Sequence, residues 1–248
     1  MGRLETVFFD ELPHPVLAER ARQGSPVFVP VGQIEAHGPH LPVGTDLLTA
    51  KELCVRAAAR VHGLVLPTLS LGNCSDFVCW PGYVVLRTTT LLAVQEDMVV
   101  SLAEQGFTRF AFVVPHGGNV YNTLCLGSSE IGRRRPELAI LCTTLGLLAG
   151  PSLKEITRGS DPDTCLALRL APDRVHKERY QGSVPAVPPW RSAAHISGDA
   201  SRLNRGFPDA VFANPAASEA EMGEALLDVA SRRLAELVED NLGEPTRT

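Results

Sequence analysis

A nearly continuous apolar run, residues 109–115, constrains the fold of this chain more than any other segment. Such a run between two helical patterns is typical of a strand that is buried on both faces, as in a parallel sheet. Similar β-rich runs alternate with amphipathic segments along the chain, so we predict an α/β fold in which helices cover both faces of a parallel sheet. The predicted strands are residues 26–31, 63–69, 109–115 and 138–143, and the predicted helices are residues 47–61, 90–105, 120–135 and 217–237.

Length, charge and hydropathy exclude several classes of protein. The 248 residues fit one large α/β domain or two small ones, and the net charge of -5 argues against a nucleic-acid-binding surface. No apolar run reaches the ~18 residues that a membrane span needs. The N-terminus lacks the apolar core of a signal peptide, so we expect a cytoplasmic protein with no membrane partner.

Six cysteines are present and none forms a CxxC pair. In this setting we expect free, mostly buried thiols and no disulfide framework. Cys74 and Cys79 lie in the segment 72–80, where one of them could act as a nucleophile, but we favour structural burial for both. The proline-rich segment 180–215 has weak periodicity, and a loop of that length is often a functional lid or an interface element.

Potential metal ligands are concentrated in residues 30–46, which are rich in glycine and proline. Glu35 and His37 follow the first predicted strand and, at spacing i, i+2, point to the same side of extended backbone. Asp46 precedes a helix, and His116 follows the apolar strand. Ligands bind at the carboxyl ends of parallel strands, so these four side chains could converge. Mixed nitrogen and oxygen ligands suit zinc, manganese or iron.

Each of these residues also has a simpler interpretation. Asp46 is a natural N-cap for the helix that follows it. A single histidine at a strand end, such as His116, is more often structural than a ligand, and Gly117 and Gly118 could form an ordinary turn. The four residues together favour a metal site much more strongly than any one of them does.

Residues 30–46 and 116–119 resemble the signature of the creatininase (creatinine amidohydrolase) family, and weaker similarities in residues 80–83, 163–175 and 217–223 follow in the same order. The resemblance covers most of the chain. It implies a three-layer α/β/α sandwich with a mostly parallel central sheet, which we interpret as a single domain over residues 1–248. It also implies a centre of two divalent metal ions and a homo-oligomer, commonly a hexamer.

Carried over by position, Glu35, His37, Asp46 and His116 match the family's metal ligands, with Asp46 as the bridging residue. The fifth family ligand is a glutamate, and the matching residue here is Asp163, which is one methylene shorter. Asp161 is the nearby substitute for that ligand.

Arg158 stands where the family usually has a histidine that helps to transfer protons. His40, His176 and His195 are candidates to replace it, and Asp161 and His195 are our candidates for protonating the leaving nitrogen. For His40 we favour a role in orienting a metal ligand over one in packing the loop.

The resemblance implies a hydrolase that cleaves a C–N bond of a small molecule, in an amide, cyclic amide or formamide, through a metal-activated hydroxide. Backbone N–H groups of Gly117 and Gly118 could stabilise the oxyanion. Two alternatives remain open. One is a peptidase that acts on a modified peptide, and the other is a weakened family member that only binds a metal or ligand.

Overall fold

Four parallel strands form the central sheet of the computed structural model, which describes residues 6–74, 80–116, 119–182, 211 and 213–243. The strands are β1 (Val27–Pro30), β2 (Leu64–Val65), β3 (Arg109–Val114) and β4 (Ala139–Thr144), in the order β2-β1-β3-β4. Val27 pairs with Leu64 of β2 and with Phe110 of β3. All four strands therefore end at the same edge of the sheet.

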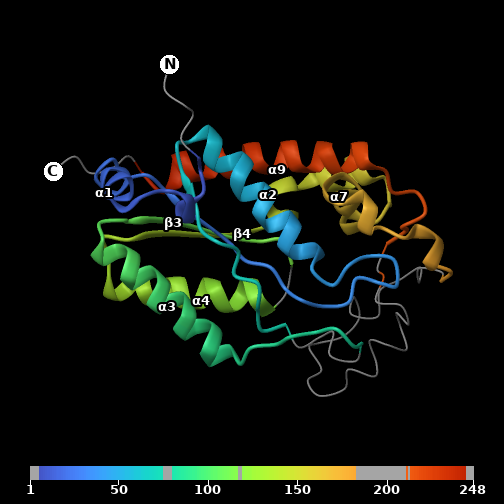
Figure 1. Ribbon diagram of the computed structural model, residues 1–248, viewed down its shortest axis with the longest axis horizontal. Coiled ribbons are helices and arrows are strands. Elements are labelled where there is room, and N and C mark those ends of the chain that lie inside the picture. The colour runs from blue at the N-terminus through green and yellow to red at the C-terminus, as the bar shows by residue number, and fades with distance from the viewer. Residues whose placement is uncertain (1–5, 75–79, 117–118, 183–210, 212, 244–248) are drawn as a thin grey trace.

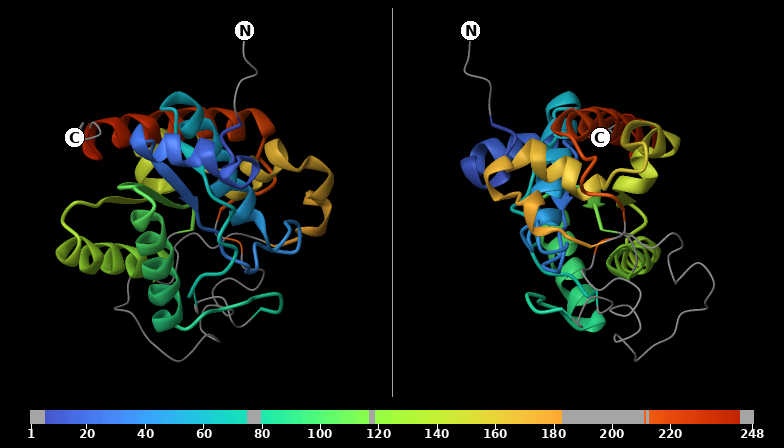
Figure 2. Two further views of the ribbon diagram at one scale, coloured as in Figure 1. Left: turned by 60° about the vertical axis from the view of Figure 1, so that its left-hand side comes forward. Right: turned by 90° about the vertical axis from the view of Figure 1, so that its right-hand side faces the viewer.

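Helices lie on both faces of this sheet, as Figure 1 shows for α2, α7 and α9 on one side and α3 and α4 on the other. The views in Figure 2 show the same layers from the side. The predicted α/β/α sandwich is thereby confirmed. The helices are α1 (His14–Arg22), α2 (Thr45–Arg60), α3 (Thr88–Glu104), α4 (Asn119–Arg134), α5 (Leu145–Ala149), α6 (Pro151–Thr157), α7 (Pro162–Leu170) and α9 (Ala220–Asn241), with 3-10 turns at Phe9–Glu11, Pro172–Arg174 and Lys177–Arg179.

Strand β3 supplies side chains to the core on each face of the sheet. Ala111 and Val113 pack with residues of α2, α5 and α9, whereas Phe110, Phe112 and Val114 pack with residues of α1, α3 and α4. All five side chains are fully buried. The continuous apolar run is explained by this position, because successive residues of a strand face opposite sides.

The predicted strands and helices all occur, with shifts of a few residues at their ends. The largest shortening is in the predicted strand 63–69, where only Leu64–Val65 forms a ladder and Leu69 adds a single bridge to Val31. The sequence analysis missed α1, α5, α6 and α7. Among the described residues, no helix is both long and apolar enough to cross a bilayer.

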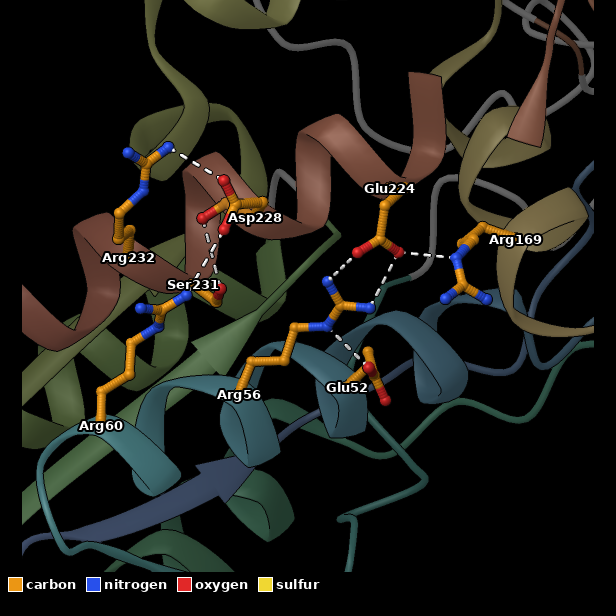
Figure 3. Close-up of polar contacts among 8 residues, drawn as sticks. All are labelled: Glu52, Arg56, Arg60, Arg169, Glu224, Asp228, Ser231 and Arg232. Atoms are coloured by element: carbon orange, nitrogen blue, oxygen red, sulfur yellow. Dashed lines mark hydrogen bonds and ion pairs between the residues drawn. The ribbon is translucent and has the colours of Figure 1, made fainter. Parts of the chain in front are cut away.

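Charged side chains tie together the helices on one face (Figure 3). Arg56 of α2 donates from Nη1 and Nη2 to the carboxylate of Glu224 on α9, at 2.7 and 3.0 Å. It also donates from Nε to Glu52 at 2.7 Å, and Arg169 of α7 donates to Glu224 at 2.6 Å. These hydrogen bonds, first of all that from Arg56, lower the pKa of Glu224 to about 2. The network links the two helices, α2 and α7, whose first turns reach the candidate site described next.

Candidate metal centre

Three buried side chains meet beyond the carboxyl end of β1. Glu35 and His37 come from the loop that follows β1, and Asp46 comes from the first turn of α2. One ligand atom from each of the three lies within 4.8 Å of the others. Glu35 and Asp46 are each only 3% exposed. Two carboxylates and an imidazole at this depth form a donor set suited to a divalent cation.

His116 joins the cluster from the end of β3. Its Nδ1 atom lies 2.8 Å from Oε1 of Glu35 and 3.7 Å from Oδ2 of Asp46. The four residues expected to converge do so, because β1 and β3 are neighbours in the sheet.

The imidazole of His37 is oriented by the backbone. Its Nδ1 atom lies 3.1 Å from the carbonyl oxygen of Glu35, and its Nε2 atom lies 3.5 Å from Oδ1 of Asp46. A carbonyl only accepts hydrogen bonds, so Nδ1 is the donor and Nε2 faces the carboxylates. Histidine ligands of metals commonly have this arrangement.

The charges of the cluster shift the ionisation of its members. Burial alone would lower the pKa of His37, but the hydrogen bond and charge of Asp46, together with the charges of Asp163 and Glu35, raise it to about 10. Burial likewise disfavours the charged form of Asp46, but the hydrogen bond and charge of His37 and the charge of His116 lower its pKa overall. The carboxylates of the cluster therefore favour a positive charge at this place in the structure.

Asp46 does not cap the helix. Helix α2 begins at Thr45 with Gly44 as its N-cap residue, and no side chain makes a capping hydrogen bond there. Asp46 lies inside the first turn, where the helix dipole stabilises a negative charge. Its carboxylate contacts His37 and His116, so the capping interpretation is wrong.

Asp161 and Asp163 have different surroundings. Asp161 is the N-cap of α7, and its Oδ2 atom accepts hydrogen bonds from the backbone N–H and the hydroxyl of Thr164 at 2.9 and 2.5 Å. Burial, together with the charges of Asp161 and Asp46, raises the pKa of Asp163 to about 7 against the opposing charges of the two histidines. The pKa of Asp163 thus depends on the charges of the cluster, and a bound cation would reduce the repulsion between Asp163 and the other carboxylates.

Two buried carboxylate oxygens also indicate that these residues fit a metal ion. Oε2 of Glu35 and Oδ2 of Asp46 are fully buried and have no hydrogen-bond partner among the described residues. Buried carboxylate oxygens without a partner are costly, and a coordinated cation satisfies them.

A thiol lies at the other side of Glu35. Cys74, Glu35 and His116 form a second group whose ligand atoms lie within 4.8 Å of one another. The sequence analysis assigned Cys74 to structural burial. No motif spacing marks Cys74, which follows β2 and comes close to His116 only because β2, β1 and β3 are adjacent.

His40 connects the loop after β1 to α7. Its Nε2 atom lies 2.8 Å from the hydroxyl of Thr164, which in turn donates to Asp161. Since that hydroxyl proton points to Asp161, the His40 ring is the donor to Thr164. His40 is therefore a buried residue that holds the loop after β1 against the first turn of α7.

The other candidate residues are not part of this cluster or lie outside the described residues. Arg158 is an exposed residue in the left-handed conformation at the end of α6, with φ 51°. His176 lies 3.4 Å from the carboxylate of Glu178. Gly117, Gly118 and His195 lie outside the described residues.

Fold and site together define an α/β/α protein with a candidate metal centre at the carboxyl ends of its strands. The family model of creatininase, described as creatinine amidohydrolase, matches residues 10–238. The chain therefore belongs to the creatininase family of amidohydrolases.

The chain is similar over most of its length to two kinds of hydrolase. It is 25% identical over 260 residues to the creatinine amidohydrolase of Pseudomonas putida, covering 95% of this chain and 97% of that protein. It is also 25% identical to the mycofactocin precursor peptide peptidase of Mycobacterium tuberculosis, covering 84% of each chain. A crystal structure of creatinine amidohydrolase superposes with a TM-score of 0.85 at 24% identity, covering 98% of this chain and 100% of that one.

Proposed function

We propose that this protein is a metal-dependent hydrolase that cleaves the C–N bond of an amide, cyclic amide or formamide in a small molecule. Its two divalent ions would be bound by Glu35, His37, Asp46, His116 and Asp163. The observation that carries the proposal is the pair of buried, unpartnered oxygens on Glu35 and Asp46, which lie among two imidazoles.

Asp46 is the residue best placed to bridge the two ions. One of its oxygens lies 3.5 Å from Nε2 of His37, and the other lies 3.7 Å from Nδ1 of His116. Each oxygen thus faces a different imidazole. Asp163 is the fifth ligand in this proposal. It lies at the start of α7, and the charges of His37, Asp46 and His116 affect its pKa.

Zinc, manganese and iron suit these ligands. Related creatininase structures are described as a manganese form and as a zinc–zinc type. When bound, such ions lower the pKa of a water molecule and polarise the carbonyl of the substrate.

The chain's own residues would complete the reaction. The N–H groups of Gly117 and Gly118 are our candidates for holding the oxyanion, and Asp161 or His195 for protonating the leaving nitrogen. Because Oδ2 of Asp161 accepts two hydrogen bonds from Thr164, a proton would have to be carried at its other oxygen.

A second candidate function is hydrolysis of a modified peptide. It is supported by the similarity to the mycofactocin precursor peptide peptidase over most of both chains. A member that only binds a metal or ligand is the third possibility, motivated by Arg158 in place of the family's histidine.

Metal analysis and a turnover screen of the purified protein test these functions. We expect two ions per chain and hydrolysis of a small cyclic amide or formamide that stops with a chelator and returns with added metal. Hydrolysis of short peptides alone would favour the peptidase. Two ions without turnover would indicate a binding protein, and absence of bound metal would refute the proposal. We also propose a cytoplasmic homo-oligomer, a hexamer, which light scattering after size-exclusion chromatography would measure.

A further inference from the structure

A cysteine shares two of the proposed metal ligands. The Sγ atom of Cys74 lies within 4.8 Å of ligand atoms of both Glu35 and His116. Cys74 is 1% exposed, and the carboxylate of Glu35 has a buried Oε2 atom that has no hydrogen-bond partner among the described residues. Cys74 and His116 therefore approach the same carboxylate, although they follow different strands of the sheet.

The backbone before Cys74 is fixed to the elements that surround the centre. Gly72 forms a bridge with Val85, and its carbonyl accepts from the N–H of Leu86 at 2.8 Å. The side chain of Asn73 donates to the hydroxyls of Thr88 and Thr123 at 3.0 and 2.8 Å. Thr123 belongs to α4, the helix that follows His116. Cys74 is thus held in place relative to His116 by neighbouring side chains and not by a free loop.

We infer that Cys74 is a ligand of the ion that Glu35 and His116 bind. The inference rests on the proposed metal centre and deepens it. As the ion binds, the S–H bond of Cys74 breaks, the Sγ–metal bond forms, and the proton leaves to solvent. The two metal positions then differ in chemistry, since the other proposed ligands, His37, Asp46 and Asp163, offer only nitrogen and oxygen.

A thiolate makes the first position softer than the second. Thiolate ligands favour zinc, whereas carboxylate and water ligands suit manganese. We therefore expect the position of Cys74 to retain zinc in a protein that is offered both metals. Replacing Cys74 by serine keeps the size of the side chain but removes the soft donor.

X-ray absorption at the zinc edge of the wild-type, zinc-loaded protein tests the inference without any substitution. A bound thiolate gives a sulfur shell about 2.3 Å from zinc, beside nitrogen and oxygen at about 2.0–2.2 Å. With two ions per chain, the sulfur shell should average to half an atom per zinc. Zinc bound with a purely nitrogen and oxygen shell would overturn the inference and leave the proposed function standing.

Cobalt substitution assigns the sulfur to a residue. We expect a thiolate-to-cobalt charge-transfer band in the near ultraviolet for the wild type, its loss in Cys74→Ser, and its retention in Cys125→Ser. Cys125 is a matched control because it is a free, half-buried thiol on α4 outside the centre. Cys74→Ser should also shift the bound metal from zinc towards manganese. A band that persists in Cys74→Ser would overturn the inference, whereas failure of the wild type to bind any cobalt or zinc would refute the metal centre itself.

Discussion

Nδ1 of His116 lies 2.8 Å from Oε1 of Glu35, and this contact joins the end of β3 to the end of β1. Parallel neighbours end at one edge, so loops far apart in sequence deliver their side chains to one place. Two further side chains approach this pair. Asp46 comes from the first turn of α2, and Cys74 comes from the segment that follows β2.

Asp46→Asn should remove both ions from the protein, because the substitution keeps the size of the side chain but removes the charge that faces both histidines. Hydrolysis should fall by more than about 100-fold, the loss typical of removing one electrostatic group of an active site. Metal analysis and kcat/KM measure these effects, and Asp97→Asn on the exposed side of α3 is the control. An Asp46→Asn protein with two ions and full activity would disprove the bridging role.

Asp163→Asn and Asp161→Ala should separate metal binding from helix capping. We expect Asp163→Asn to lower the metal content with little loss of stability. Asp161→Ala removes the N-cap of α7, so it should cost about 1 kcal/mol in free energy of unfolding while both ions remain.

Metal content and urea unfolding of both variants distinguish these roles. If Asp161→Ala lost an ion and Asp163→Asn kept both, the assignment would have to be reversed. Loss of turnover in Asp161→Ala with both ions in place would support proton donation by Asp161.

Thr164→Val should destabilise the fold because it leaves Nε2 of His40 and Oδ2 of Asp161 without the hydroxyl between them. Losing the partner of a buried polar group costs about 1–3 kcal/mol. Thr164→Ser keeps the hydroxyl and should retain most of the stability in urea unfolding. Equal stability of the two variants would show that the hydroxyl does not matter.

Glu224→Gln should weaken the network between α2, α7 and α9 in a pH-dependent way. The pKa of Glu224 is lowered from 4.5 to about 2 in the folded protein, first of all by the hydrogen bond from Arg56. A lowered pKa means that its stabilisation is present above about pH 5 and is lost as the pH falls towards 2.

The side chain of Glu224 is 43% exposed, so solvent screening limits the effect at pH 7 to about 0.5–1 kcal/mol. Unfolding of wild type and variant from about pH 6 down to about pH 2.5 should therefore show a difference in stability that shrinks as the pH falls, and this difference should be smaller in high salt. A difference that stayed constant over this range would rule out ionisation of Glu224 as its source.

Gly223→Ala should lower the free energy of unfolding, although it adds only one methyl group. A Cβ atom at Gly223 of α9 would lie 2.1 Å from the carbonyl oxygen of Cys165 on α7, where backbone has to move. We expect a loss of about 1–3 kcal/mol. A Cβ atom at Gly132 of α4 would have no neighbour within 4 Å. Gly132→Ala should therefore raise the free energy of unfolding by up to about 1 kcal/mol through helix propensity. Thermal unfolding of the two variants should thus move in opposite directions.

The main strands and long helices were predictable because they carry a periodic signal. The apolar residues of β3 occupy consecutive positions, and α2 and α9 present apolar stripes to one core. The missed helices lack such a signal. Helix α5 has five residues and α6 has seven, which is too short for a helical repeat to stand out from a loop.

The ligand types in residues 30–46 and at His116 were also evident from sequence, because glycine and proline restrict that loop and strand ends mark where it points. The sequence did not show which of two neighbouring aspartates would act as a ligand. The roles of Asp161 and Asp163 depend on where α7 begins, which makes Asp161 the N-cap residue and puts Asp163 in the first turn.

The class of fold and the gathering of potential ligands at the strand ends follow from the amino-acid sequence alone. The contacts between side chains are known only from the folded chain: Asp46 lies between two imidazoles, His40 lies on Thr164, and Cys74 lies near His116. The physical reason is that hydrophobic periodicity is a local property that a sequence displays directly, whereas a metal centre depends on the order of strands in the sheet, which brings distant loops within a few ångströms.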